Sequence, residues 1–182
     1  MRKSLIITEV FNPELFIINQ VSNDWLENEL PFEVLTKNPS YPFGKIYPGF
    51  KNSFYSNSFQ SEIKVHRLVF VPGYKDSPIL KIINYFIFII SSFFLIISIG
   101  RRFDRIFIYQ TGPLTNALSA CLLKSIFNYN ITLWVQDLWP ESVYGYGFKK
   151  TFLRKKILNF LVKYIYSKSD IILFSSGKFR DS

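Results

Sequence analysis

The sequence predicts an α/β fold in which a parallel β-sheet is covered by helices on both faces. Short β-prone segments alternate with helical patterns along the whole chain, which is typical of βαβ units joined by right-handed crossovers. The chain has 182 residues, 48% of them hydrophobic and 19% aromatic, which is enough for one domain with its own core. We therefore expect residues 1–182 to form a single Rossmann-like domain.

Three strands and one helix are expected in the first half of the chain. The strands are residues 5–10, 32–36 and 63–71, where β-prone apolar runs end at turn-forming residues. Apolar periodicity predicts a helix over residues 15–28. Residues 38–57 carry three prolines and two glycines among aromatic residues, so we predict a long loop there. Long loops in compact domains are usually functional or mobile.

The second half is expected to hold three strands, residues 105–109, 131–135 and 171–174. Two helices should alternate with them, at residues 115–127 and 152–168. The second of these helices mixes lysines with apolar residues. It suits an anionic membrane surface, or it is a surface helix with one solvated face.

Residues 82–100 form an uncharged apolar segment between Lys81 and the pair Arg101-Arg102. Its length reaches that of a transmembrane helix, and the basic flanks suit one. Asn84 and three serines interrupt it, and a predicted strand follows at once. A core helix and an interfacial helix are therefore the other interpretations, with spanning less favoured.

The composition points to an anionic partner. The formal net charge of +9 suits a phospholipid surface, a phosphorylated substrate or nucleic acid. No nucleic-acid-binding motif is evident, so nucleic acid is least favoured. The single cysteine, Cys121, is expected in the core, and with the single histidine, His66, it excludes a Cys/His zinc cluster. We therefore predict no metal site. The apolar run at the N-terminus is too short for the core of a signal peptide.

Polar residues follow several of the predicted strands, where ligands bind in open α/β sheets. Asn12-Pro13-Glu14 follows the first strand and is either a ligand loop or a helix start, with Asn12 as cap and Pro13 at the first position. The fingerprint G-x-G-x-x-G is absent, which disfavours dinucleotide binding. Thr111-Gly112-Pro113 precedes a predicted helix, whose first amides could bind a sugar hydroxyl or phosphate; a plain turn is the alternative.

The segment 131–142 is the most informative, because an apolar strand ends in amide and carboxylate groups. Asp137 and Glu141 could orient sugar hydroxyls or a proton in transfer. Both come from one turn, so a placement on opposite sides of a glycosidic bond is not implied. The alternative is an ordinary polar turn. Trp134 is expected in the core, and Trp139 is either core or a platform for a sugar.

Together these blocks resemble the N-terminal domain of bacterial family-four glycosyltransferases of the GT-B fold, in the branch related to fucosamine-type transferases of O-antigen and capsule synthesis. The most specific matches are Asn-Pro-Ser-Tyr-Pro at 38–42 and Gln-Asp-Leu-Trp-Pro-Glu at 136–141. The matching blocks, in order along nearly the whole chain, are 11–14, 34–44, 49–50, 65–67, 111–113, 135–141, and 169–172 with 175–176.

The resemblance implies retaining transfer of a sugar from a nucleotide-sugar to a lipid-linked saccharide acceptor at the cytoplasmic face of the inner membrane. It implies that this domain receives the acceptor, while a second domain, absent from this chain, binds the nucleotide-sugar and carries a paired-glutamate motif. The chain is then expected to be inactive alone and to work with a separate donor-binding domain. No cofactor is implied beyond the nucleotide-sugar co-substrate.

The resemblance also assigns roles to residues. The catalytic positions are Gln136, Asp137 and Glu141, and the substrate-binding positions are Asn12, Pro13, Glu14, Tyr41, Thr111, Gly112 and Trp139. Two departures from the family pattern stand out. Leu15 to Ile18 replace the usual glycines after the first strand, and Gln136 replaces a common histidine. Glutamine cannot act as a general base, so only hydrogen bonding is expected of it.

Two other classes compete with this interpretation. A non-catalytic protein could use residues 82–100 as a membrane anchor. A nucleic-acid-binding module is weaker, and it would require salt-sensitive binding to an oligonucleotide. Release from membranes by high salt would favour a peripheral domain, whereas resistance to salt and carbonate would favour a spanning helix.

Overall fold

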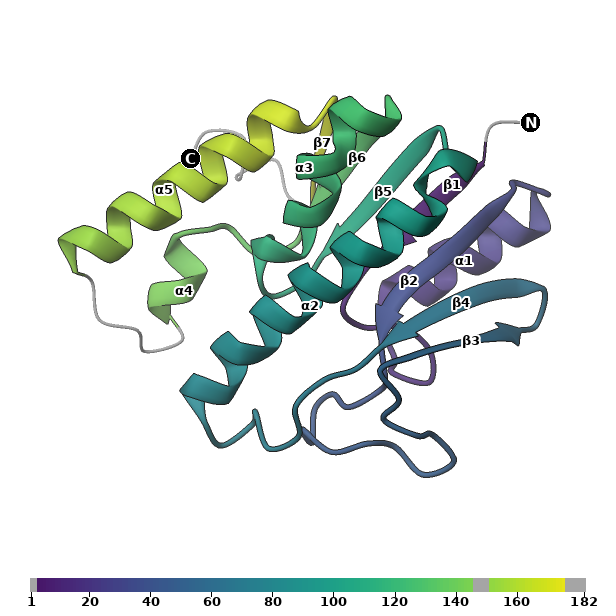
Figure 1. Ribbon diagram of the computed structural model, residues 1–182, viewed down its shortest axis with the longest axis horizontal. Helices are drawn as coiled ribbons and strands as arrows, with labels where there is room; N and C mark the ends of the chain where they lie inside the picture. Colours follow the sequence, from purple (N-terminus) through teal and green to yellow (C-terminus); the bar gives the residue numbers. More distant parts are fainter. Residues whose placement is uncertain (1–2, 146–150, 176–182) are drawn as a thin grey trace.

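The computed structural model of the protein describes residues 3–145 and 151–175, which form one seven-stranded sheet (Figure 1). The strand order is β3-β4-β2-β1-β5-β6-β7, and every neighbouring pair is parallel except β3 with β4. The strands are β1 (Ser4–Ile7), β2 (Phe32–Lys37), β3 (Tyr55–Gln60), β4 (Ile63–Leu68), β5 (Arg105–Gln110), β6 (Asn130–Val135) and β7 (Ile171–Phe174). Ser176, part of a predicted strand-end motif, lies outside the described residues.

Helices cover both faces of this sheet, so the predicted fold class is confirmed (Figure 1). One face carries α1 (Ile17–Glu27), and the other carries α2 (Pro78–Ile99), α3 (Leu118–Phe127) and α5 (Phe152–Lys168). Three short elements complete the fold: the 3₁₀ turns η1 (Gly100–Arg102) and η2 (Leu114–Ala117), and the helix α4 (Glu141–Gly145).

Alternation along the strands divides the core into two clusters. Leu5 and Ile7 of β1 pack toward α2, α3 and α5, whereas Ile6 between them packs toward α1. Cys121 is buried in the larger cluster, as predicted, and burial raises the pKa of its thiol to about 12. Trp134 is partly buried against the smaller cluster, also as expected for a core residue.

Two predictions for the first half of the chain are wrong. The expected loop 38–57 ends early, because β3 begins at Tyr55 and pairs antiparallel with β4 at the edge of the sheet. The helix α1 begins at Ile17 with Phe16 as its cap, so Asn12 and Pro13 do not start it. Asn12 lies in a loop instead, where its N–H donates to the side chain of Asn19.

The apolar segment predicted at 82–100 belongs to α2, which begins earlier, at Pro78, behind the cap Ser77. In the described part of the chain, α2 with its 3₁₀ extension is the one helix long and apolar enough to cross a membrane. The side chain of Asn84 bonds both backbone groups of Val71, at 2.7 and 3.0 Å. Ser92 bonds Ser119 of α3 at 2.8 Å. Through these hydrogen bonds the polar residues of α2 attach the helix to the rest of the domain.

A buried charge cluster joins β2 and β4 beneath the three-helix face. His66 Nε2 lies 2.6 Å from Glu33 Oε2, and Lys3 and Arg102 contact the same carboxylate at 2.7 and 3.3 Å. Burial lowers the pKa of His66, although Glu33 opposes the shift. Burial alone would raise the pKa of Glu33, but His66, Lys3 and Arg102 outweigh it and lower the pKa.

This cluster makes the fold sensitive to acid. In the unfolded chain His66 has its ordinary pKa of 6.5, so below that pH it binds a proton more readily than in the folded protein. Glu33 likewise binds a proton more readily in the unfolded chain once the pH falls below its ordinary pKa of 4.5. The free energy of unfolding should therefore fall as pH drops through 6.5 and fall further below 4.5. Urea titrations between pH 8 and about 4 measure this. His66 is the only histidine, so H66Q should flatten the upper part of the curve, and an unchanged slope there would contradict its role.

Candidate functional site

The topology places a switch point at the carboxyl ends of β1 and β5. The chain passes from β1 to β2 on one side, and later returns through α2 to β5 on the other side of β1. In open α/β sheets ligands bind at such a switch point, outside the carboxyl ends of the strands. The residues that follow β1, β5 and β6 are therefore the candidates for a site.

The turns after β5 and β6 are tied to each other. The N–H of Gly112 donates to Asp137 Oδ2 at 2.7 Å, and the indole of Trp139 donates to the Gly112 carbonyl at 3.0 Å. Gln110 donates to the same carbonyl at 2.7 Å and accepts weakly from the N–H groups of Gln136 and Asp137. The structure thus brings together four predicted site residues, Gly112, Gln136, Asp137 and Trp139.

The backbone at Gly112 explains why glycine stands there. Its φ of +89° lies in the left-handed region, which other residues adopt only with strain. A Cβ at this position would meet no atom within 4 Å. Glycine is therefore required by the backbone conformation and not by a lack of space. The neighbouring predicted residue Thr111 is half-buried, and η2 begins three residues later, at Leu114.

Among the described residues, four buried polar atoms without a hydrogen-bond partner lie on the elements after β5 and β6, while two others lie on β2 and β4, at Thr36 and Arg67. The four are Oγ1 of Thr115, Oδ1 of Asn116, Nε2 of Gln136 and Oγ of Ser142. Such atoms cost about 1–3 kcal/mol each when unpaired, so they are typical of groups that bond a ligand or water. The set holds both donors and acceptors and carries no charge, which suits hydroxyl groups.

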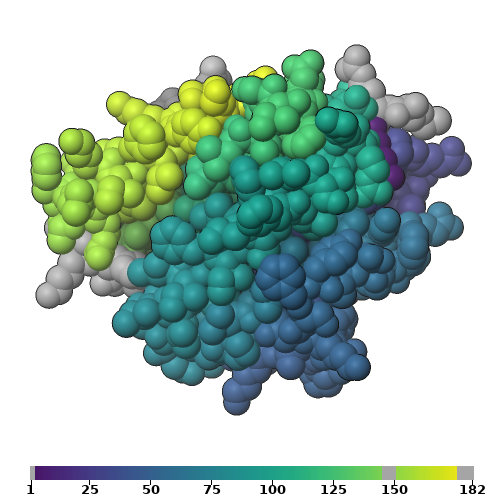
Figure 2. All heavy atoms as spheres, in the orientation of Figure 1, coloured from purple at the N-terminus to yellow at the C-terminus, as the bar shows by residue number. Residues whose placement is uncertain are grey.

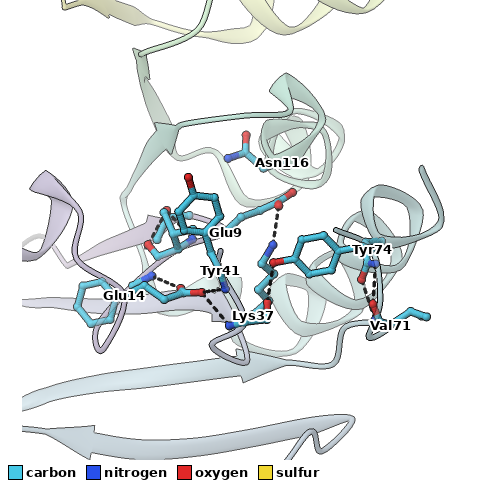
Figure 3. A network of polar contacts seen from close by, with 12 residues as sticks. Glu9, Glu14, Lys37, Tyr41, Val71, Tyr74 and Asn116 are labelled. Carbon is cyan, nitrogen blue, oxygen red and sulfur yellow. Dashed lines mark hydrogen bonds and ion pairs between the residues drawn. The ribbon is translucent and has the colours of Figure 1, made fainter. Parts of the chain in front are cut away.

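The sequence analysis missed an ion pair between Glu9 and Lys37, which lies on the β1 and β2 side of the switch point (Figure 3). Lys37 Nζ lies 3.1 Å from Glu9 Oε2, and the two side chains are only 10% and 8% exposed. In this view the carboxylate of Glu9 lies between Lys37 and Asn116. Burial would lower the pKa of Lys37, but Glu9, Tyr74 and Glu14 raise it, so the amine is charged.

Strand register contains the signal that could have found this pair. Ile7 of β1 lies opposite Leu35 of β2, so two residues further along Glu9 meets Lys37. Two opposite charges that follow neighbouring parallel strands by the same number of residues are therefore expected to be in contact. This prediction requires knowing that the two strands are neighbours. The second carboxylate oxygen of Glu9 accepts no hydrogen bond from the described residues.

The predicted binding residues near β1 are occupied by structural contacts. Both oxygens of Glu14 accept backbone N–H groups, from Phe11 at 3.2 Å, Ser40 at 2.8 Å and Tyr41 at 2.6 Å. Burial nevertheless raises the pKa of Glu14. Glu14 therefore fixes the loop that carries Tyr41, whose side chain is 48% exposed.

Asn12 and Glu141 complete the list of predicted positions. The carbonyl of Asn12 accepts from the buried guanidinium of Arg67 at 2.5 Å, and Pro13, the next residue of this turn, is half-buried. Glu141 is exposed at the first residue of α4. The predicted residues thus form two groups, one after β1 and one after β5 and β6, on either side of the switch point.

Comparison of the chain with protein-family models and with curated proteins finds no match. Among residues 3–145 and 151–175, no three His, Cys, Asp or Glu side chains are grouped to hold a metal ion.

Proposed function

We propose that this chain is the acceptor-binding half of a retaining glycosyltransferase. It would serve the transfer of a sugar from a nucleotide-sugar to a lipid-linked glycan in surface polysaccharide synthesis, such as that of O-antigen or capsule. The observation that supports this most is the set of buried, uncharged donors and acceptors on the elements after β5 and β6, which also carry Asp137. Sugar hydroxyls need such mixed partners. Trp139 is only 9% exposed and belongs to the larger core cluster, so of its two predicted roles the structure favours the core one.

Each residue has a proposed role in holding the acceptor. Asp137 has one oxygen committed to Gly112, which leaves the other to accept from a hydroxyl. Gln136 would donate through its unpaired amide nitrogen, and Asn116 would accept. Gln136 cannot take a proton, so these groups orient the acceptor, and the reaction needs a donor-binding domain to hold the nucleotide-sugar beside it.

The lipid-linked acceptor places the proposed activity at the cytoplasmic face of the inner membrane, with the domain bound peripherally. A second candidate, a non-catalytic protein anchored by a spanning helix 82–100, is favoured by the length and composition of α2. Spanning would break the bonds of Asn84 and Ser92 to the rest of the domain. Extraction by salt or carbonate separates the two, since only a spanning helix resists both.

Sugar binding is testable by saturation-transfer difference NMR on the purified chain. A panel of methyl glycosides should give saturation transfer at millimolar concentrations, which is typical for an isolated half-site. D137N should weaken the signal several-fold, because it removes the charge that faces the hydroxyl. The matched variant D24N, at an exposed position on α1, should leave it unchanged. Absence of transfer from every glycoside would overturn the proposal.

Turnover provides the complementary test. The purified chain should release no nucleotide from UDP-, GDP- or dTDP-sugars, because only one of the two substrates is held. Sugar transfer by residues 1–182 without any partner would contradict the assignment of this chain to the acceptor side.

A further inference from the structure

The outward side of α2 differs from that of an ordinary surface helix. Toward the domain α2 buries the apolar residues Phe88 and Ile96 together with the polar residues Asn84, Ser91 and Ser92, while Ser98 is exposed. Its outward side is apolar at helical spacing, with exposed Ile79, Ile82, Ile83, Phe86, Ile90, Phe94 and Ile97. A surface helix normally turns its charged side to water, so this side of α2 is built for a non-aqueous neighbour.

The two other helices on this face continue the apolar surface. Exposed large apolar residues are Leu122 and Ile126 on α3, and Phe152, Leu153, Ile157 and Phe160 on α5. Figure 2 views this face, where α2, α3 and α5 lie next to one another across much of the surface. We call α2, η1, α3 and α5 the helical layer.

The helical layer is also purely basic. Its sequence contains no aspartate or glutamate. Its basic residues are Lys81, Arg101, Arg102, Lys124, Arg154, Lys155, Lys156, Lys163 and Lys168. The helix on the opposite face, α1, contains Asp24 and Glu27 and no lysine or arginine. Arg102 is paired with Glu33 on β2, and Lys124 with Asp170 just before β7. The other cations lie among exposed apolar side chains in a layer that has no acidic residue of its own, and this combination matches the surface of an anionic bilayer.

We propose that the helical layer lies flat on an anionic phospholipid membrane, with α2 in the plane of the interface. This inference rests on the proposed function and deepens it by naming the lipid-facing surface and the charge of the lipid. This orientation would hold the candidate site at the membrane surface, where it could bind acceptors that are anchored in the same bilayer. The buried bonds of Asn84 and Ser92 keep α2 attached to the domain, so the helix does not need to cross the bilayer.

A second copy of the chain fits this surface less well. Two helical layers facing each other would place lysines and arginines against lysines and arginines, which costs binding energy. A lipid surface supplies the missing anions without a fixed geometry, and it admits the aromatic side chains between headgroups.

Sedimentation with lipid vesicles tests the proposal on the chain as it is. Binding should be strong to phosphatidylcholine vesicles containing phosphatidylglycerol, weak to pure phosphatidylcholine, and reduced by high salt. F86S/F94S should weaken binding at least about tenfold, since each aromatic ring that leaves the interface exposes a large apolar area. The control L15S/L30S, at exposed leucines flanking α1, should bind as the parent does.

Charge reversal on α5 gives a second variant. Lys155 and Lys156 are exposed, and K155E/K156E should remove most of the preference for phosphatidylglycerol. Equal binding by the parent and F86S/F94S, or equal binding to both vesicle types, would overturn the proposal. So would a stable dimer by light scattering that F86S/F94S dissolves. The sugar-binding assay uses no membrane, so either proposal can fail without the other.

Discussion

Replacing Lys37 by methionine is expected to lower the free energy of unfolding by about 3–5 kcal/mol. Methionine matches the volume of lysine but removes the ammonium group that lies 3.1 Å from Glu9. Glu9 is only 7% exposed, so it would be left as a buried carboxylate without its cation. Removal of one partner from such a pair costs more than removal of both. Urea unfolding followed by circular dichroism measures the change.

The double variant E9Q/K37M is the decisive control for this pair. It should recover most of the stability lost in K37M, because no buried charge then lacks a partner. K45M changes an exposed lysine and should stay within about 0.5 kcal/mol of the parent. If the two single changes simply added in E9Q/K37M, the ion pair would not be coupled.

The sheet and its helices could be predicted because each element is locally consistent. The strands β1, β2 and β6 are short apolar runs, and their alternation with amphipathic helices requires a parallel sheet. The strand β3 could not, because its sequence, Tyr-Ser-Asn-Ser-Phe-Gln, has no apolar alternation and its formation depends on pairing with β4. The start of α1 was also misjudged, since Asn12 is held by partners distant in sequence or in the next helix.

The candidate site was predictable to the extent that parallel strands end at the same edge. That rule alone brings Gly112 and Asp137 together, and the structure joins them at 2.7 Å. The pair Glu9 and Lys37 required the order and register of the strands, because the two residues lie 28 positions apart. A carboxylate such as Glu14 looked like a ligand group, because nothing local reveals that three backbone amides point at it.

The two sides of the molecule also have to be understood together. The carboxyl edge of the sheet carries buried hydrogen-bonding groups at the switch point, while the helical layer on one face is apolar and basic. A soluble sugar would require only the first. The combination is what an acceptor with a polar glycan and a membrane-embedded lipid would need, so the two surfaces support the same proposed substrate independently.

Replacing Glu14 by alanine is expected to cost about 3 kcal/mol of stability or more, because it leaves three buried backbone N–H groups without an acceptor. These groups belong to Phe11, Ser40 and Tyr41, so the change also detaches the loop after β2 from the loop after β1. Besides urea unfolding, limited chymotrypsin digestion should report the release, through faster cleavage after Phe43.

Two control variants accompany E14A: the isosteric variant E14Q and the surface variant E62A. Glutamine keeps one carbonyl oxygen for Ser40 and Tyr41 but presents an amide donor toward Phe11, so E14Q should lose roughly half as much stability as E14A. Glu62 is exposed in the β3–β4 turn, and E62A should be nearly neutral. Unchanged stability and unchanged cleavage in E14A would mean that the loops hold without the carboxylate. Glu14 would then again be available for the substrate contact predicted from the sequence.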